Sequence, residues 1–598
     1  MFNFVQRFCI CSWCLLLLAC EPGVGPVGTQ VSEPGRYEGY SAPLFGSYRV
    51  SSQYVAVRDG TQLAMDLYRP VHPDGQVVEE PLPVLWMHTP YSRRTPLFLT
   101  GPLSMGEIYP GSAARLVKYG YVVAIVDFRG LYASFGQNMA YNRGEWVEAA
   151  RLDAYDITEW LAAQPFSNGR IGMWGCSATG GSQLQAASTA PPSLKAVFPM
   201  SCEFDAYPFG VPGGMAPAQG PTREPPTTVD KLFRGLLASP VDADVDRSQL
   251  AAAAASQGEP LDNLGYLPFR DSVPDALPDP WWLVSSPHTY LDEINGSGAA
   301  FYLAANWDEA ATKYGAFFTW NNLTRPAKLL IGPAGHCAWS DILVEAPSAT
   351  SVLGMTGFDI AVEELRFFDY WLKGVENGLM DEPPVYFYTY GAPAGQEWQA
   401  AESWPLPNER RVRYYLGEAS LSTVAPAASQ AQDDFRVSYD APGDDPAAHG
   451  LVYETAPLQA RVQITGHPVV ELWLASTATD SDVVAYVQNV APDGSTTSYS
   501  MHGRLRASLR SEAQAPYDNL GLPWHPARQQ DVQPLRPGVP TKMRFDVLPF
   551  SMVFEAGHRI RLILTFADRA TPQLSPIPTV SVYRDIEHAS SIILPIID

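Results

Sequence analysis

The sequence predicts an α/β protein built on a parallel sheet, interrupted by an insertion and followed by a separate all-β domain. Between residues 46 and 383, apolar runs such as 121–126 alternate with helical stretches such as 146–163, which is typical of a parallel sheet covered by helices. From residue 384 to 598, short alternating strands separated by turns, for example 469–474, predict a β-sandwich. Because 598 residues exceed what one core holds, about three domains are expected.

The N-terminal residues predict an export signal. Arg7 is followed by an apolar stretch from Phe8 to Ala19, which is shorter than the roughly 20 residues that a membrane-spanning helix needs. The stretch leads to Cys20 in a pattern that resembles a lipobox, which implies cleavage before Cys20 and lipidation of its thiol. We therefore expect a lipoprotein signal peptide over residues 1–19 and a Gly/Pro/Ser tether over residues 20–45. A plain secretory signal is the alternative.

Charge and composition narrow the range of partners. The formal net charge of -23 repels nucleic acid, so we expect no nucleic-acid partner. Contact with a membrane is expected only through the N-terminal lipid anchor, in the bacterial cell envelope. The ten histidines include no His-x-x-x-His pair and the chain has no nucleotide-binding glycine loop, so neither a metal nor another cofactor is predicted. Whether the protein forms a homo-oligomer stays open.

A serine in a glycine-rich turn is the candidate nucleophile. Residues 171–182 read Ile-Gly-Met-Trp-Gly-Cys-Ser-Ala-Thr-Gly-Gly-Ser, so Ser177 follows an apolar run and lies between Gly175 and Gly180. A nucleophile at a strand end needs small neighbours because backbone and helix approach closely, and Gly175, Gly180 and Gly181 are expected to provide that room. The second glycine comes three residues after the serine rather than two, so an ordinary strand-to-helix turn is the alternative.

An acid and a histidine follow Ser177 in the order that α/β-hydrolases use. A strand-like run that begins at Phe301 ends in Asp308, and a second one that begins at Ala327 leads through a Gly/Pro turn to His336. Because the carboxyl ends of parallel strands converge on one crevice, these three side chains are expected to meet as a catalytic triad. The alternatives are that Asp308 caps a helix and that His336 is an ordinary loop histidine.

Two donors for an oxyanion hole are also predicted. The strand candidate 82–87 leads to Tyr91, whose hydroxyl is placed to bind a developing negative charge. The backbone amide of Ala178, the residue after the nucleophile, offers the second donor. A half-buried tyrosine at the rim of the crevice is the alternative for Tyr91.

Several separate motifs resemble one enzyme family. They are Arg58–Ala64, Pro90-Tyr91, Asp127–Gly130, Asp156–Trp160, Gln164–Gly169, Trp307-Asp308, Gly332-Pro333 and Phe368–Gly374. Through these motifs the chain, from residue 50 onward, resembles the CocE/NonD family of serine hydrolases, which includes esterases, Xaa-Pro dipeptidyl-peptidases and α-amino acid ester hydrolases. The resemblance implies an α/β-hydrolase fold with a helical cap insertion, followed by a C-terminal jelly roll of the galactose-binding-like type. It also implies Ser177 as nucleophile, Asp308 and His336 as its partners, and Tyr91 with the Ala178 amide as oxyanion hole.

The catalytic domain is expected in two parts, residues 46–204 and 286–383. Residues 205–285 between them are Pro/Gly-rich and include an alanine-rich helix candidate at 248–256. An insertion at this point overhangs the crevice, so a cap that excludes water is its expected role. The C-terminal domain, residues 384–598, is expected to pack against the catalytic domain, and sugar binding is not inferred from its fold.

Three cysteines lie beside the predicted active-site loops. Cys176 precedes the candidate nucleophile, Cys337 follows the candidate histidine, and Cys202 follows another strand. Three small buried thiols are expected, with a disulfide between two of them as the alternative in an oxidising envelope.

The predicted reaction is hydrolysis of a carboxylic ester or of an acyl or peptidyl amide through an acyl-enzyme, on a small molecule or short peptide. Family members that hydrolyse α-amino acid esters carry acids two and three residues after the catalytic aspartate. This chain has Ala310 and Ala311 there, which disfavours a buried substrate ammonium. An Xaa-Pro dipeptidyl-peptidase is the first alternative, with Glu203 or Asp205 as the acid for the substrate N-terminus. A non-catalytic surface lipoprotein that binds carbohydrate or a partner is the second.

Overall fold

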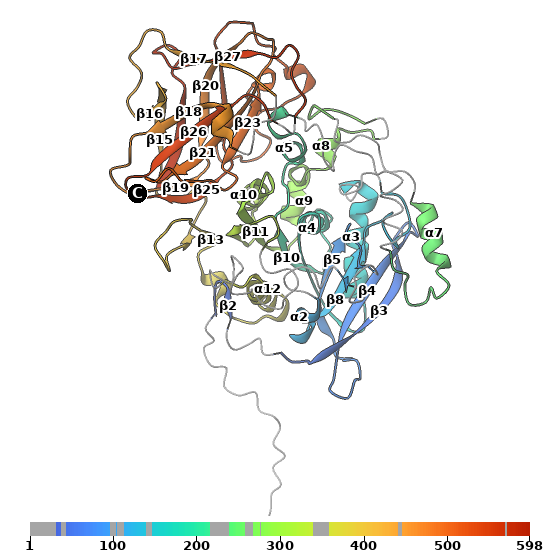
Figure 1. The fold of residues 1–598 in the computed structure, drawn as a ribbon. Coiled ribbons are helices and arrows are strands. Elements are labelled where there is room, and N and C mark those ends of the chain that lie inside the picture. The colour runs from blue at the N-terminus through green and yellow to red at the C-terminus, as the bar shows by residue number, and fades with distance from the viewer. Residues whose placement is uncertain are drawn as a thin grey trace, which may run out of the picture.

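A ten-stranded mixed sheet forms the centre of the catalytic region, with the strand order β14-β13-β12-β11-β10-β9-β5-β8-β4-β3 (Figure 1). The structure, a computed structural model, describes residues 32–37, 43–95, 103–104, 113–138, 146–215, 238–257, 267–274, 277–338, 358–439, 445–568 and 571–597. The strands of this sheet are β3 (Ser47–Ala56), β4 (Gln62–Val71), β5 (Leu82–Thr89), β8 (Val122–Asp127), β9 (Ser167–Cys176), β10 (Leu194–Met200), β11 (Ala300–Asp308), β12 (Ala327–Gly335), β13 (Val385–Tyr388) and β14 (Trp398–Ala401). Every neighbouring pair from β13 to β8 is parallel, so the expected parallel sheet is present.

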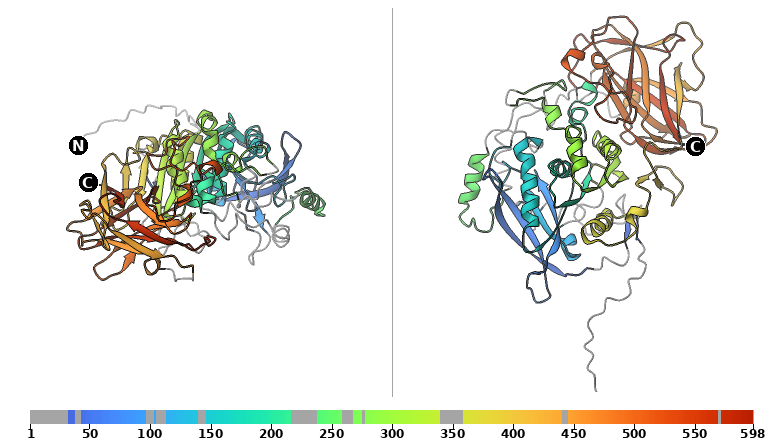
Figure 2. Two further views of the ribbon diagram at one scale, coloured as in Figure 1. Left: turned by 90° about the horizontal axis from the view of Figure 1, so that it is seen from above. Right: turned by 180° about the vertical axis from the view of Figure 1, so that it is seen from behind.

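Helices cover both faces of this sheet (Figure 2). They are α2 (Ala113–Lys118), α3 (Glu148–Ala162), α4 (Ala178–Ala187), α9 (Leu291–Gly296), α10 (Thr312–Asn322) and α12 (Ile360–Phe368), the last continued by a π-helical turn, η5 (Asp369–Lys373). Alternate residues of β5 separate the two faces: Leu85 packs with the core under α2 and α12, whereas Trp86 packs with the core under α3 and α4. This alternation buries both faces of the sheet, which explains why its strands read as continuous apolar runs.

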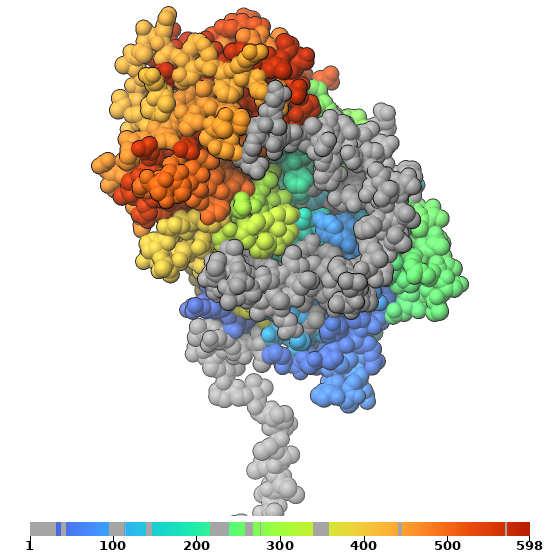
Figure 3. All heavy atoms as spheres, in the orientation of Figure 1, coloured from blue at the N-terminus to red at the C-terminus, as the bar shows by residue number. Residues whose placement is uncertain are grey.

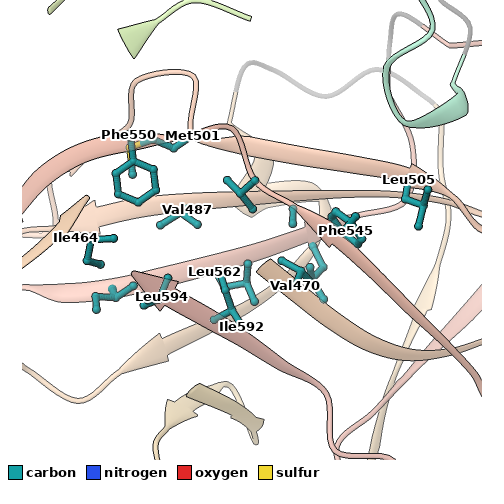
Figure 4. Packing of buried hydrophobic residues seen from close by; sticks show 14 of the residues in the cluster. Ile464, Val470, Val487, Met501, Leu505, Phe545, Phe550, Leu562, Ile592 and Leu594 are labelled. Atoms are coloured by element: carbon teal, nitrogen blue, oxygen red, sulfur yellow. The ribbon is translucent and has the colours of Figure 1, made fainter. Parts of the chain in front are cut away.

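The C-terminal domain is built of antiparallel strands, apart from one parallel contact between β16 and β18. They are β15 (Glu409–Gly417), β16 (Ser420–Ser422), β17 (Gln432–Arg436), β18 (Leu451–Thr455), β19 (Val462–Gly466), β20 (Val469–Ser476), β21 (Asp482–Val490), β22 (Thr496–Thr497), β23 (His502–Arg506), β24 (Thr541–Asp546), β25 (Phe550–Phe554), β26 (Arg559–Thr565), β27 (Thr579–Tyr583) and β28 (Ser591–Ile597). Val487, Leu562 and Leu594 point into the interior between these strands (Figure 4). The space-filling view shows the domain, orange to red, as a lobe against the catalytic region (Figure 3).

The catalytic sheet extends past residue 384, where the sequence predicts the C-terminal domain to begin. Strand β13 pairs parallel with β12, and β14 pairs antiparallel with β13. The alternating pattern of these short strands matches that of the sandwich, so the sequence does not separate the two sheets. Their pairing assigns β13 and β14 to this first sheet, whereas Tyr390 between them forms a parallel bridge to Met552 of the C-terminal domain.

The predicted tether is partly docked on the catalytic domain. Residues 32–37 form a hairpin of β1 (Ser32–Glu33) and β2 (Arg36–Tyr37). The backbone N–H of Gly35 donates to the buried carboxylate of Glu363 on α12 at 2.7 Å, and Arg366 of the same helix binds the Ser32 hydroxyl. Residues 32–37 of the predicted tether, residues 20–45, are therefore docked on α12. Residues 1–31, which contain the predicted signal peptide and Cys20, lie outside the described residues.

The insertion between β10 and β11 carries short helices in its described part. They are α5 (Ala206–Gly210), the 3-10 turn η2 (Pro212–Gly214), α7 (Ser248–Ser256) and α8 (Trp281–Val284). Turn η2 reaches the C-terminal domain, because the backbone at Gly213 packs on Arg504 of β23. The insertion thus lies against both other domains. In the described part of the chain, no helix combines the length and apolarity needed to cross a membrane.

Candidate active site

The nucleophile candidate lies in a sharp turn between strand and helix. Strand β9 ends at Cys176, helix α4 begins at Ala178, and Ser177 between them has φ 62° and ψ -126°. Its backbone N–H donates to the carbonyl of Met200 at the end of β10, at 2.9 Å. A serine with positive φ is a costly conformation that persists where the surrounding structure enforces it, and it is the geometry expected of an exposed nucleophile.

Two of the three glycines provide the room that the turn requires. Gly175 has φ 145°, and a Cβ there would come within 2.4 Å of the Thr179 hydroxyl. A Cβ on Gly180 would come within 2.5 Å of the carbonyl of Met200, so α4 could not approach β10 as closely. Gly181 has no neighbour within 4 Å of such a Cβ, so the expectation that it also provides room is wrong.

His336 is paired with a buried carboxylate, that of Glu309. Its Nδ1 lies 3.1 Å from Oε2 of Glu309, whose side chain is fully buried. Ser201 and the backbone of Asn306 donate to Oε1 at 2.6 and 2.8 Å, and Thr312 donates to Oε2 at 2.5 Å. A carboxylate with this many donors stays ionised and accepts a hydrogen bond from the Nδ1–H of histidine, which leaves Nε2 of the neutral ring with a lone pair.

Asp308, the acid expected at the histidine, lies elsewhere. It is exposed, and its Oδ1 accepts a hydrogen bond from Ser500 of the C-terminal domain at 2.8 Å. Strand β11 ends at Asp308, and the following turn directs the next side chain, Glu309, toward the histidine. Two consecutive acids at a strand end were the available signal, and the sequence does not show which of them faces His336. The structure corrects the partner of His336 from Asp308 to Glu309.

The C-terminal domain contacts the loop that carries both acids. Besides the bond from Ser500 to Asp308, the ammonium of Lys313 donates to the carbonyls of Trp307 and Ser500, at 2.6 and 3.2 Å. The pKa of Lys313 is lowered to about 7, because burial lowers it more than the charges of Glu309 and Asp308 raise it. The loop that positions Glu309 is therefore held from both domains.

Tyr91 lies next to Ser177. Its hydroxyl is 3.4 Å from the Ser177 hydroxyl oxygen, as expected for a side chain at the reacting centre. The loop of Tyr91 is anchored by Arg93, which is fully buried and lies 3.3 Å from Asp66. The backbone N–H of Arg93 donates to Asp127, and its guanidinium donates to the carbonyl of Ser239 in the insertion. Sequence reasoning did not identify this arginine.

Ala178 is the first residue of α4, so its backbone N–H is among those that have no acceptor within the helix. The positive end of the helix dipole lies at the same place. This position suits a developing oxyanion on an acyl group attached to Ser177.

A disulfide joins the turn of Ser177 to the loop of His336. Cys176 and Cys337 are bonded, with their Cα atoms 5.9 Å apart, and the buried Cys202 is not part of this disulfide. The expectation of three free thiols is wrong, because folding brings together two cysteines separated by 161 residues. Three non-glycine residues at this site have positive φ: Ser177, Ser201 and Cys337. Such strained positions cluster where the surrounding fold enforces a functional geometry.

An aromatic-walled cavity of about 270 Å³ lies between the insertion, α10 and the C-terminal domain. It begins one residue beyond Glu309, at Ala310 and Ala311. Its aromatic walls are Tyr207, Tyr314, Phe318, Tyr517, Trp524 and Phe545. Asp205 also lines it, but Arg270 binds this carboxylate at 2.6 and 2.7 Å and Tyr517 donates to it at 3.1 Å. Asp205 thus forms a buried ion pair with Arg270, and the cavity wall is mainly apolar.

The environment of His336 favours its charged form. Burial lowers the pKa of His336, but the hydrogen bond and charge of Glu309, with a contribution from the charge of Glu203, outweigh it and raise the pKa above 6.5. Because the pKa is higher in the folded than in the unfolded protein, the pair stabilises the fold below pH 6.5. This stabilisation is lost as the pH rises through the folded pKa.

Known proteins resemble the chain over nearly its whole length. The family model for X-Pro dipeptidyl-peptidase (S15 family) matches residues 59–338, and the model for the X-Pro dipeptidyl-peptidase C-terminal non-catalytic domain matches residues 377–572. A protein of Mycobacterium bovis named as a serine esterase is 30% identical over 635 residues, which cover 95% of this chain and 98% of that protein. The cocaine esterase of a Rhodococcus species is 28% identical and covers 92% of this chain and 99% of its own.

The fold also matches a solved structure. A CocE/NonD family hydrolase from Staphylococcus aureus superposes with a TM-score of 0.69 at 19% identity, covering 92% of this chain and 94% of that one. The predicted fold class, an α/β-hydrolase body followed by an all-β C-terminal domain, is confirmed.

The two neighbouring acids can be distinguished by the titration of His336. In the Glu309→Gln variant the pKa of His336 should fall below 6.5, because burial remains while the opposing hydrogen bond and charge are lost. The matched control Asp308→Asn should leave this pKa close to that of the parent protein. Histidine-selective NMR measures the shift, with His336→Gln identifying the signal. A larger change in Asp308→Asn than in Glu309→Gln would contradict the pairing.

Proposed function

The chain belongs to the CocE/NonD family of serine hydrolases, and from this premise we propose that Ser177, His336 and Glu309 form its catalytic triad. The observation that carries the proposal is the pairing of His336 Nδ1 with the buried carboxylate of Glu309 at 3.1 Å. It leaves Nε2 as the nitrogen available to Ser177, whose strand is bonded to the histidine loop through Cys176 and Cys337.

The proposed reaction has two acyl-transfer steps. His336 accepts the Ser177 proton, and the serine oxygen attacks the carbonyl carbon of the substrate. The resulting oxyanion accepts hydrogen bonds from the Tyr91 hydroxyl and the Ala178 amide, while Glu309 stabilises the charged imidazole. His336 then donates the proton to the leaving group, and water repeats the sequence on the acyl-enzyme.

We propose an uncharged ester as the preferred substrate. With Glu309 as the triad acid, the positions two and three residues later are Ala311 and Thr312, so no carboxylate is available there for a substrate ammonium. Asp205 is neutralised by Arg270, and the nearby cavity has aromatic walls. A substrate with an apolar, uncharged acyl group suits these surroundings better than one with a free N-terminus.

Removal of the nucleophile tests the proposed triad. Ser177→Ala should lower kcat by about 10⁶ by analogy with other serine triads, and Glu309→Gln by about 10⁴. Turnover of a chromogenic ester measures both. Ser182→Ala in the same helix, whose hydroxyl donates to the carbonyl of His88, is the matched control and should keep most of the activity. Activity of Ser177→Ala equal to the parent would remove the assignment.

A fluorophosphonate probe extends the same test to the non-catalytic alternative. The parent protein should form an adduct at Ser177, and the Ser177→Ala variant should form none. Without an adduct on the parent protein, the carbohydrate- or partner-binding lipoprotein would replace the enzyme.

The Xaa-Pro dipeptidyl-peptidase alternative rests on Glu203. This residue is buried and its charge acts on His336, so it is the remaining acid beside the site that a substrate ammonium could approach. For an esterase, kcat/KM should be at least about 10²-fold higher on a neutral aryl ester than on a dipeptidyl-proline amide, because the ammonium would be desolvated at a cost. Glu203→Gln should retain the esterase activity. Faster cleavage of the amide, abolished in Glu203→Gln, would establish the peptidase instead.

We also propose that the protein is an exported lipoprotein of the bacterial cell envelope. The apolar stretch before Cys20 and the disulfide support this, because disulfides persist mainly in oxidising compartments. Cells that express the full chain with an alkyne-labelled fatty acid should incorporate the label, and Cys20→Ala should abolish it. Export and cleavage without incorporation of lipid would instead support a plain secretory signal.

A further inference from the structure

One covalent bond connects the segments on either side of the proposed reacting centre. Cys176 is the last residue of β9 and immediately precedes Ser177, while Cys337 immediately follows His336. The two sulfur atoms therefore link the nucleophile turn directly to the histidine loop. The inference below rests on the proposed function of Ser177 and His336.

The bond holds the histidine loop away from its own strand. In the sheet register, Cys176 of β9 is level with Met200 of β10, Ala304 of β11 and Leu330 of β12, so at about 4.8 Å per strand spacing Leu330 is roughly 14 Å from Cys176. The Cα atoms of the two cysteines are nevertheless 5.9 Å apart. The chain between Leu330 and Cys337 must therefore bend back toward β9, and the end of β11 stays paired with it as far as Gly335. Cys337 has φ 58°, and the N–H of Ala338 donates to the carbonyl of Gly335 in this turn.

The other bonds of the loop attach it to a different strand. The amide of Asn306 donates to the carbonyl of Gly335 at 3.0 Å, and Glu309 binds the His336 ring. Both partners lie at the end of β11, so these contacts orient the ring relative to β11 rather than to β9. The side chain of His336 is 45% exposed, so packing restrains it incompletely. The disulfide is the covalent connection to the strand that carries the nucleophile.

We propose that Cys176 and Cys337 are positioning residues, whose disulfide keeps Nε2 of His336 within reach of the Ser177 hydroxyl. Reduction leaves the sheet and the Glu309 pairing in place but releases the loop toward the end of β12. A displacement of about 1 Å at reacting groups costs about 10²-fold in rate. The reduced enzyme is thus a folded hydrolase with low turnover.

The reaction that releases the loop is an exchange with a dithiol. A dithiol such as dithiothreitol transfers two electrons and two protons to the protein disulfide, which becomes two thiols, while the reagent closes to its own cyclic disulfide. The reagent supplies everything that the step requires. Peptide mapping without reductant shows which state is present, because the peptides that contain Cys176 and Cys337 stay linked only when oxidised.

The test compares the full-length oxidised protein, the same protein after dithiol treatment and the double variant Cys176→Ala/Cys337→Ala. In the last two, kcat should fall about 10²-fold, KM should change by less than about threefold, and fluorophosphonate labelling of Ser177 should slow to the same extent as kcat. Circular dichroism should be unchanged. The dithiol should have no further effect on the double variant, and Cys202→Ala, which removes the cysteine outside the disulfide, should keep the parent kcat.

The outcomes separate a positioning role from a structural one. If the double variant and the reduced protein keep the parent kcat and labelling rate while unfolding at a lower temperature, the disulfide only stabilises the fold and the proposal is overturned. If the double variant does not fold, the reduced parent protein, kept cold and checked by peptide mapping, decides between the same two results. If the oxidised parent protein is not labelled at Ser177, the proposed function fails rather than this inference.

Discussion

The buried carboxylate of Glu309 is the interaction on which the site depends. It collects donors from four segments: Ser201 after β10, Asn306 in β11, Thr312 at the start of α10, and His336 after β12. Burying the Glu309 carboxylate without hydrogen-bond partners would cost free energy. The four donors and the carboxylate therefore stabilise one another only when all of them are in the positions described above. The geometry of the histidine is therefore tied to the packing of three neighbouring strands of the parallel sheet.

The domains around the sheet complete this arrangement. Trp307 at the end of β11 and Phe317 on α10 belong to the same buried core as Val470 and Leu562 of the C-terminal domain. Ser500 from that domain also contacts Asp308, directly beside Glu309. The loop that carries the acid is thus packed from the catalytic sheet on one side and from the C-terminal domain on the other. The all-β domain therefore contacts the loop that carries Glu309 directly.

The correspondence between sequence and structure is closest where a feature depends on local chemistry. The strained turn at Ser177 follows from a strand, a serine and Gly175, because only a residue without Cβ avoids the close contact with Thr179. The choice between Asp308 and Glu309 does not follow from the sequence, since both are acids. A shift of one residue in the chain changes which of the two side chains faces His336. Likewise, the patterns of β13 and β14 suit either sheet, and the pairing of β13 with β12 and of β14 with β13 decides which sheet contains them.

By itself, the sequence determined the class of fold and the family, because periodicity, turn composition and short motifs are local properties. Only the tertiary structure decided which carboxylate meets His336, which cysteines are bonded and where residues 32–37 dock. Each of these depends on distances between segments that are remote in the chain. Such distances are set when strands find their order and register in the sheet, which no short pattern of residues contains.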